Sequence, residues 1–167
     1  MRSSGLFGEA AEPLSSVTHM RSNNSQFFKT KKPKGTIEKN RIWLNLSNEE
    51  GAFKQTLLGY VTGATNQNEG RFDGESLDGN EFIDFYSVNE TKKLTIQGRA
   101  LPFENTDLIP LGYRSTIDGE FTIAIDHTEG ILDGQTIYLE DKKTGVIHNL
   151  NTSDYNFIAE TGTFTDR

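Results

Sequence analysis

The chain has 167 residues, about the length of one domain. It carries 24 Asp and Glu against 17 Lys and Arg, and this net charge of −7 argues against nucleic-acid binding, which needs a basic face. The absence of cysteine excludes disulfides, thiolate zinc sites, iron–sulfur clusters and a cysteine nucleophile. No apolar run approaches the roughly 20 residues of a membrane-spanning helix, and the first residues lack the apolar stretch of a signal peptide.

The beginning of the chain differs in composition from the rest. Residues 1–35 are rich in Ser and Asn, show no sustained hydrophobic period, and include a Lys-rich run after Phe28. Such a polar, basic run is usually a solvated linker. We therefore expect residues 1–35 to be a flexible leader or the end of a preceding region. We expect residues 36–167 to form the folded domain, with a last strand that is cut short after Phe164.

From Ile42 onward the sequence is a series of short predicted strands. Residues 42–47 alternate between aliphatic side chains and other types, which is the period of two expected of a strand. Asp-Gly pairs, which favour tight turns, occur at 73–74, 78–79, 118–119 and 133–134. The further predicted strands are 55–63, 81–88, 93–103, 119–126, 136–141, 145–150, 155–160 and 161–164.

Short strands at steady spacing with glycine turns predict an all-β domain, an antiparallel β-sandwich of jelly-roll or immunoglobulin-like type. The segment Lys142–Gly145 predicts a hairpin turn in which Gly145 takes a positive φ. Large apolar side chains at alternating positions are the candidates for the core. They are Trp43, Phe82, Phe85, Ile96, Phe121, Ile123, Leu139 and Phe157.

Acidic residues concentrate between positions 71 and 84, within a glycine-rich segment. Hard oxygen ligands at short spacing in such a segment suit Ca²⁺, although Leu77 departs from the helix–loop–helix calcium pattern. Two alternatives remain open: two Asp-Gly turns with solvated acids, or a glycosidase-like carboxylate pair in a cleft. The predicted calcium ligands are Asp73, Glu75, Asp78, Asn80 and Asp84.

Exposed aromatic rings on one sheet face would favour a different function, the stacking of sugar rings. Most aromatic side chains in a β-sandwich belong to its core, so burial of these rings would remove that interpretation. The candidate stacking residues are Trp43, Tyr60, Tyr86 and Tyr113. The nucleophile elbow Gly-x-Ser-x-Gly and the phosphate-binding Gly-Lys-Ser/Thr loop are both missing from the sequence.

Several longer phrases resemble one known group of domains. They are RIWLNLSNEEGAFKQTLLGYVTGATN, FDGESLDGNEFIDFYSVN, LTIQGRALPFENTDLIPLGYRSTIDGEFTIAID and IYLEDKKTGVIHNL with the final YNFIAETGTFTDR. Over residues 36–167 they resemble the β-domain that precedes the sorting signal of type IX secretion substrates in Bacteroidota. The resemblance implies an exported, all-β module at the cell surface or outside the cell, and it carries no catalytic motif over to this chain.

From this resemblance we expect a non-catalytic spacer or accessory module next to a sorting signal. Its expected partners are the preceding domain of the same polypeptide, the secretion machinery or a polysaccharide. The alternative is a module that binds carbohydrate or another surface ligand, with Ca²⁺ as a stabilising ion. A small hydrolase would need a cleft that holds paired acids, which the sequence does not reveal.

Overall fold

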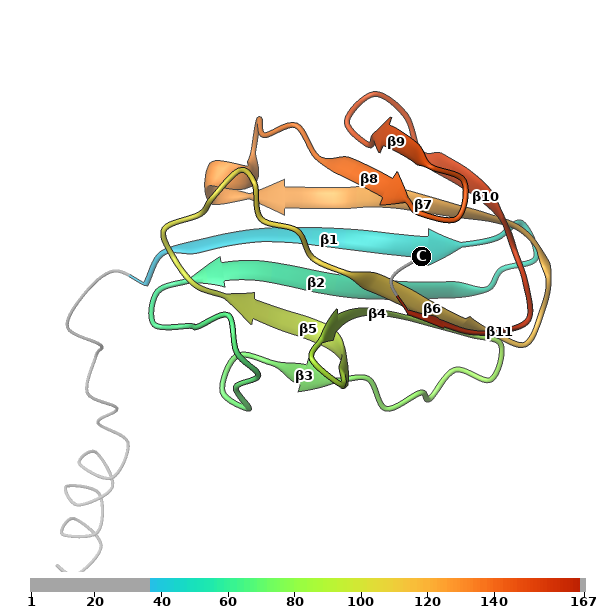
Figure 1. The fold of residues 1–167 in the computed structure, drawn as a ribbon, viewed down its shortest axis with the longest axis horizontal. Coiled ribbons are helices and arrows are strands. Elements are labelled where there is room, and N and C mark those ends of the chain that lie inside the picture. The colour runs from blue at the N-terminus through green and yellow to red at the C-terminus, as the bar shows by residue number, and fades with distance from the viewer. Residues whose placement is uncertain (1–36, 166–167) are drawn as a thin grey trace, which may run out of the picture. The chain divides into compact units, whose positions relative to one another are not determined.

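The computed structural model describes residues 37–165, which form an almost entirely β structure (Figure 1). The predicted leader, residues 1–35, lies outside the described residues. The elements in chain order are β1 (Lys39–Ser47), β2 (Phe53–Val61), β3 (Gly74–Glu75), β4 (Ile83–Asn89), β5 (Lys92–Arg99), β6 (Leu111–Ser115), β7 (Gly119–Glu129), the short 3₁₀ helix η1 (Gly130–Leu132), β8 (Tyr138–Asp141), β9 (Val146–Asn149), β10 (Tyr155–Ala159) and β11 (Gly162–Thr165).

Nine of these strands belong to one sheet. Its order is β10-β7-β1-β2-β5-β4-β6-β11, and β3 pairs with β5 beside this path. Neighbouring strands are antiparallel except β2 and β5, which are parallel. Strands β8 and β9 form a separate antiparallel hairpin. The prediction of an all-β, mainly antiparallel domain is therefore confirmed, whereas the two-sheet sandwich is not.

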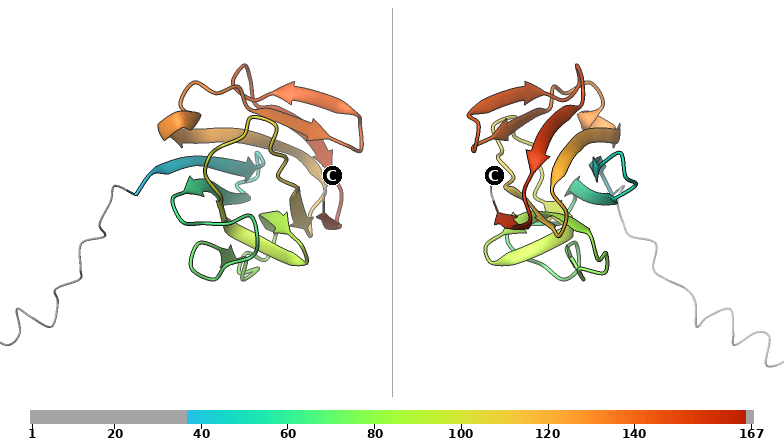
Figure 2. Two further views of the ribbon diagram at one scale, coloured as in Figure 1. Left: turned by 60° about the vertical axis from the view of Figure 1, so that its left-hand side comes forward. Right: turned by 90° about the vertical axis from the view of Figure 1, so that its right-hand side faces the viewer.

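The large sheet is curled, because its two outermost strands are neighbours in the sequence. Strands β10 and β11 stand at opposite ends of the strand order, yet residues 160 and 161 alone separate them. So short a connection spans roughly 10 Å at most, so the two ends of the sheet must approach each other there. Figure 2 shows this curl, and Tyr113 of β6 contacts Phe157 of β10 with 5.6 Å between ring centroids.

The core lies on the concave side of the curled sheet. Strand β1 shows why, because Ile42, Leu44 and Leu46 are buried while Trp43 and Asn45, on the opposite face, are half-buried. Among the predicted core residues, Phe85, Phe121, Ile123 and Phe157 are buried and Leu139 packs against the cluster. The prediction was wrong for Phe82 and Ile96, which are 51% and 44% exposed.

The turn chemistry follows the sequence closely at the β8–β9 hairpin. Asp141 pairs with Val146 across the strands, and Gly145 has a φ of +71°, as the sequence predicted. The Asp141 carboxylate accepts hydrogen bonds from the backbone N–H groups of Lys143 (2.9 Å) and Thr144 (3.3 Å). An Asp side chain that bonds the backbone ahead of it fixes the geometry of a tight turn.

Candidate functional site

A cavity of about 370 Å³ opens over the concave face of the sheet. Its floor consists of buried aliphatic and aromatic side chains from several strands, and the size falls within the roughly 300–1,000 Å³ typical of small-molecule pockets. The floor residues are Ile42, Leu44, Leu58, Tyr60, Phe85, Ile123 and Phe157. The curl of the sheet therefore leaves an apolar space that the side chains of the floor do not fill.

Two segments form the walls of this cavity. One is the covering loop (residues 101–110), which joins β5 to β6 and passes in front of β1 and β2 in Figure 1. The other runs from residue 136 to residue 142 and includes β8. The polar residues that line the cavity come from these walls rather than from the floor, apart from the tyrosine hydroxyls. They are Asn105, Thr106, Asp107, Thr136, Glu140, Asp141 and Lys142.

Asp107 attaches the covering loop to the sheet. The Tyr60 hydroxyl donates to Asp107 Oδ2 at 2.7 Å, and Arg99 Nε donates to the same oxygen at 3.0 Å. Arg99 Nη2 also donates to Asp107 Oδ1, which makes the ion pair bidentate. Phe103 meets the Tyr60 ring edge-on, with 4.9 Å between centroids. Burial first, and then the hydrogen bond to Asp107, raise the pKa of Tyr60 well above its ordinary value.

The opposite wall is held by Asp141. Besides its bonds within the hairpin turn, this buried carboxylate accepts a hydrogen bond of 2.7 Å from the Tyr155 hydroxyl. Tyr155 stacks in turn on Phe157 of the same strand, with 6.1 Å between ring centroids. A carboxylate that is bonded on both oxygens keeps the β8–β9 hairpin in place against β10.

The cavity thus combines an apolar floor with a polar rim. This arrangement is typical of sites that bury the apolar body of a small ligand and orient it with a few polar groups. The rim carboxylates of Asp107 and Asp141 are already engaged by Arg99, Tyr60, Tyr155 and backbone donors. The two carboxylates therefore hold the walls of the cavity in place, and the arrangement is suited to binding and enclosing a molecule.

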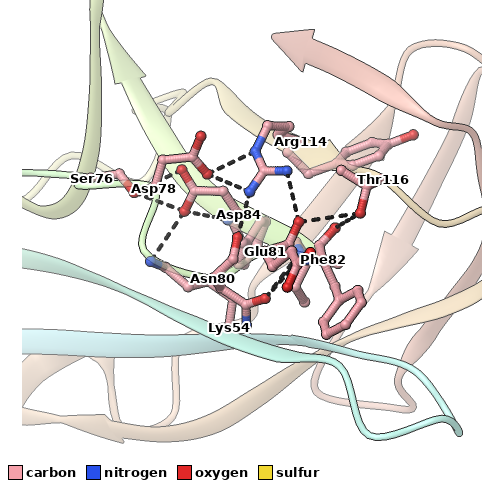
Figure 3. Close-up of polar contacts among 12 residues, drawn as sticks. Lys54, Ser76, Asp78, Asn80, Glu81, Phe82, Asp84, Arg114 and Thr116 are labelled. Carbon is pink, nitrogen blue, oxygen red and sulfur yellow. Dashed lines mark hydrogen bonds and ion pairs between the residues drawn. The ribbon is translucent and has the colours of Figure 1, made fainter.

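Two of the carboxylates predicted as calcium ligands, those of Asp78 and Asp84, lie with Asn80 in a polar cluster between β2, β4 and β6 (Figure 3). Asp84 is buried on β4, where Lys54 Nζ lies 3.2 Å from Oδ1 and the Ser76 hydroxyl lies 2.7 Å from both carboxylate oxygens. Asp78 instead pairs with Arg114, whose Nε donates to Oδ1 at 2.7 Å. Each carboxylate is therefore neutralised by a cation of the protein itself.

The other three predicted calcium ligands are also used separately. Asp73 accepts from the backbone N–H of Gly98 at 2.8 Å, and Glu75 forms an exposed ion pair with Lys92. The Asn80 side chain accepts from two backbone N–H groups ahead of it, at 2.9 and 3.2 Å. Within residues 37–165, no three His, Asp or Glu side chains are placed to hold a metal ion. The structure does not assemble the five residues into one ligand group.

The predicted stacking residues do not form a common surface. Tyr60, Tyr86 and Tyr113 are 5%, 0% and 4% exposed, so their rings belong to the interior. Trp43 lies on the outer, convex face, where it stacks on His127 with 3.9 Å between ring centroids. The Arg41 guanidinium lies 4.9 Å from the same Trp43 ring. Burial of the tyrosines removes the sugar-stacking platform proposed from the sequence.

Sequence reasoning missed the residues that cover the cavity. Phe103 ends the predicted strand 93–103 but lies in a loop, and the sequence predicts no strand or site at Asp107. One signal was available, because Leu101–Pro110 carries apolar residues without the period of two and contains two prolines. Such a segment is a connection that packs its own side chains on the domain. Which strands it crosses depends on the curl of the sheet, which local patterns do not encode.

The chain belongs to a family described as a domain of unknown function (DUF8693), whose profile matches residues 11–167. No curated protein and no solved structure gives a significant match. Among the described residues, none forms a helix that is both long and apolar enough to cross a membrane.

Proposed function

We propose that this domain is a non-catalytic binding module that takes a small, mainly apolar molecule into the cavity of its curled sheet. The observation that carries the proposal is the apolar space of about 370 Å³ over the concave face. The cavity is open to water, and apolar surface that lines it costs free energy while water covers it. A bound apolar molecule would recover part of that cost, because it restores contacts to the floor residues.

The form of the sheet supports the same function. We infer that the curled sheet serves as a half-barrel rather than as one layer of a sandwich. The interior of a small barrel is either filled by side chains or holds one small ligand. Here the β10–β11 corner brings the ends of the sheet together, and the covering loop crosses the open side.

A test is the binding of Nile red, an uncharged dye whose fluorescence rises in apolar surroundings. The wild-type domain should bind it saturably at one site. Leu58→Trp places a large side chain in the floor and should weaken binding at least about tenfold, or by about 1.4 kcal/mol. The matched control is Leu57→Trp, because Leu57 neighbours Leu58 on β2 but points to the other face of the sheet and does not line the cavity.

Two results would overturn the binding proposal. One is a wild-type domain that does not bind the dye saturably, and the other is a Leu58→Trp variant that binds it as tightly as the Leu57→Trp control. Circular dichroism first establishes that both variants are folded. If Leu58→Trp does not fold, Leu44→Phe is a smaller change in the same floor and carries the same expectation.

For the cellular role, we propose an accessory module of an exported surface protein. The support is the resemblance of residues 36–167 to the β-domain before type IX sorting signals, with the preceding domain of the same polypeptide as the first expected partner. A binding cavity and an accessory position are compatible, since such a module can hold a ligand beside another domain. Surface proteolysis of intact cells that carry the gene tests this: a protein protected until the cells are lysed would contradict export.

A further inference from the structure

The geometry points to the covering loop as a lid over the cavity, with the Asp107 carboxylate as its latch. This inference deepens the proposed function, because it concerns access to the same cavity. Asp107 acts here as a positioning residue: it holds the loop through Arg99 and Tyr60 rather than by contact with a ligand. Removal of the Asp107 carboxylate should therefore open the cavity while the sheet stays folded.

The hydrogen bonds of the loop support this assignment. Between residues 101 and 109, the described bonds to the rest of the domain are those of the Asp107 side chain. The backbone N–H of Asp107 bonds within the loop, to Glu104 at 3.0 Å, and the next attachment is the Pro110 carbonyl at the start of β6, which accepts from Val88. Segments with few hydrogen bonds to their surroundings open locally at low cost.

Packing divides the loop in the same way. Leu101, Phe103 and Ile109 are partly buried against the core, so both ends of the loop are attached by apolar contacts. Between them, Glu104, Asn105 and Thr106 are exposed, and Leu108 is 80% exposed although it lines the cavity. The middle of the loop is thus fastened by the Asp107 ion pair rather than by burial, and its movement would uncover the floor.

The cysteine-free sequence allows a direct test that needs no ligand. Leu44 and Leu46 are both buried and lie on the same face of β1, but Leu44 lines the cavity and Leu46 does not. Leu44→Cys and Leu46→Cys each introduce one thiol, and its rate of reaction with a small disulfide reagent measures how often that position opens. Each variant is compared with and without Asp107→Ala.

The lid predicts that Asp107→Ala accelerates labelling of the Leu44→Cys thiol at least about tenfold and that of the Leu46→Cys thiol less than about twofold. Glu104→Ala, an exposed change in the same loop, should leave both rates unchanged. An equal acceleration at both thiols would mean general destabilisation, and no acceleration at Leu44→Cys would mean that Asp107 is not a latch. Either result overturns the inference. Arg99→Gln breaks the same ion pair from the other side and serves if Asp107→Ala does not fold.

Failure of this inference is distinguishable from failure of the proposed function. If the wild-type domain does not bind Nile red, the binding proposal fails, while the labelling rates still report whether the loop opens. If binding occurs and the lid is real, Asp107→Ala should raise the association and dissociation rates of the dye together, by a similar factor of at least about threefold. A change in dissociation rate alone would show that Asp107 contacts the ligand and is not a latch.

Discussion

Tyr60 and Tyr86 show how strongly the fold acts on single side chains. Burial raises the pKa of Tyr86 to about 12, and the negative charges of Asp84 and Asp78 add to the effect. The pKa of Tyr60 is also raised, by burial and by Asp107. In both residues the folded state favours the neutral phenol. The sequence left open whether these rings are exposed or buried, because an aromatic residue in a strand reveals neither its face nor its hydrogen-bond partner.

The shifted tyrosines predict a loss of stability at alkaline pH. Above the ordinary tyrosine pKa of 10, the unfolded chain releases these protons while the folded domain retains them, so the free energy of unfolding falls as pH rises through that range. Denaturant unfolding of the wild type and of Tyr60→Phe, at neutral and alkaline pH, measures the effect. Tyr60→Phe should show a shallower alkaline decline, and the exposed Tyr138→Phe should not. Equal slopes in all three proteins would contradict the prediction.

The buried Asp84–Lys54 pair yields a second prediction. Asp84→Ala leaves the largely buried ammonium of Lys54 without its counter-charge and removes the bonds to Ser76 and to the Phe85 N–H. We expect a loss of about 2–4 kcal/mol in the free energy of unfolding, measured with denaturant.

The control for Asp84→Ala is Glu75→Ala, which breaks the exposed pair with Lys92 and should cost under about 1 kcal/mol. A double-mutant cycle of Asp84→Ala with Lys54→Met isolates the part of the loss in free energy of unfolding that comes from the ion pair. If Asp84→Ala costs no more than Glu75→Ala, the pair does not hold β2 and β4 together.

At the level of strands, local patterns predicted much of the sheet. The alternation of β1, the turn at Asp133-Gly134 and the positive φ of Gly145 follow from neighbouring residues, whereas Gly74 and Gly119 of two other Asp-Gly pairs begin strands β3 and β7. The parallel pairing of β2 with β5 does not follow from neighbouring residues, because Leu57 meets Ile96, which lies 39 positions later in the sequence. Nor do local patterns reveal the partners of the acidic segment 73–84, because Lys54, Lys92 and Arg114, which pair with its carboxylates, come from other strands.

Gly112 allows β11 and Tyr86 to approach β6 closely, which the sequence alone does not indicate. A Cβ at this position of β6 would lie 2.5 Å from the Phe164 carbonyl oxygen and 2.6 Å from Tyr86 Cε2. Gly112→Ala should therefore push β11 away from β6 and lower the free energy of unfolding by about 2 kcal/mol or more. Gly70→Ala is the control, because a Cβ there meets nothing within 4 Å, and it should change stability by less than about 0.5 kcal/mol. Equal stabilities would show that β6 and β11 have room to separate.

At the scale of the whole domain, the contact between the two ends of the curled sheet determines where the core forms and where the cavity lies. Tyr113 contacts Phe157 across the two ends of the sheet and stacks on Phe164 at 4.9 Å. Sequence patterns could identify the strands that enclose a core, but not that the sheet bends back on itself and leaves a space beneath the covering loop. That outcome depends on contacts between residues far apart in the chain, such as Asp107 with Tyr60.

Because the two ends of the sheet meet, we expect the described strands to unfold as one cooperative unit. Trp43, the one tryptophan of the chain, stacks on His127 between β1 and β7, so its fluorescence reports these two strands near the β10 end of the sheet. Circular dichroism reports all strands together, and the two denaturant transitions should coincide. Phe85→Leu, on β4 toward the other end of the strand order, should cost about 1–2 kcal/mol and move both transitions equally. If Phe85→Leu moves the dichroism transition and leaves the Trp43 transition in place, the two parts of the sheet unfold separately and the curl does not couple them.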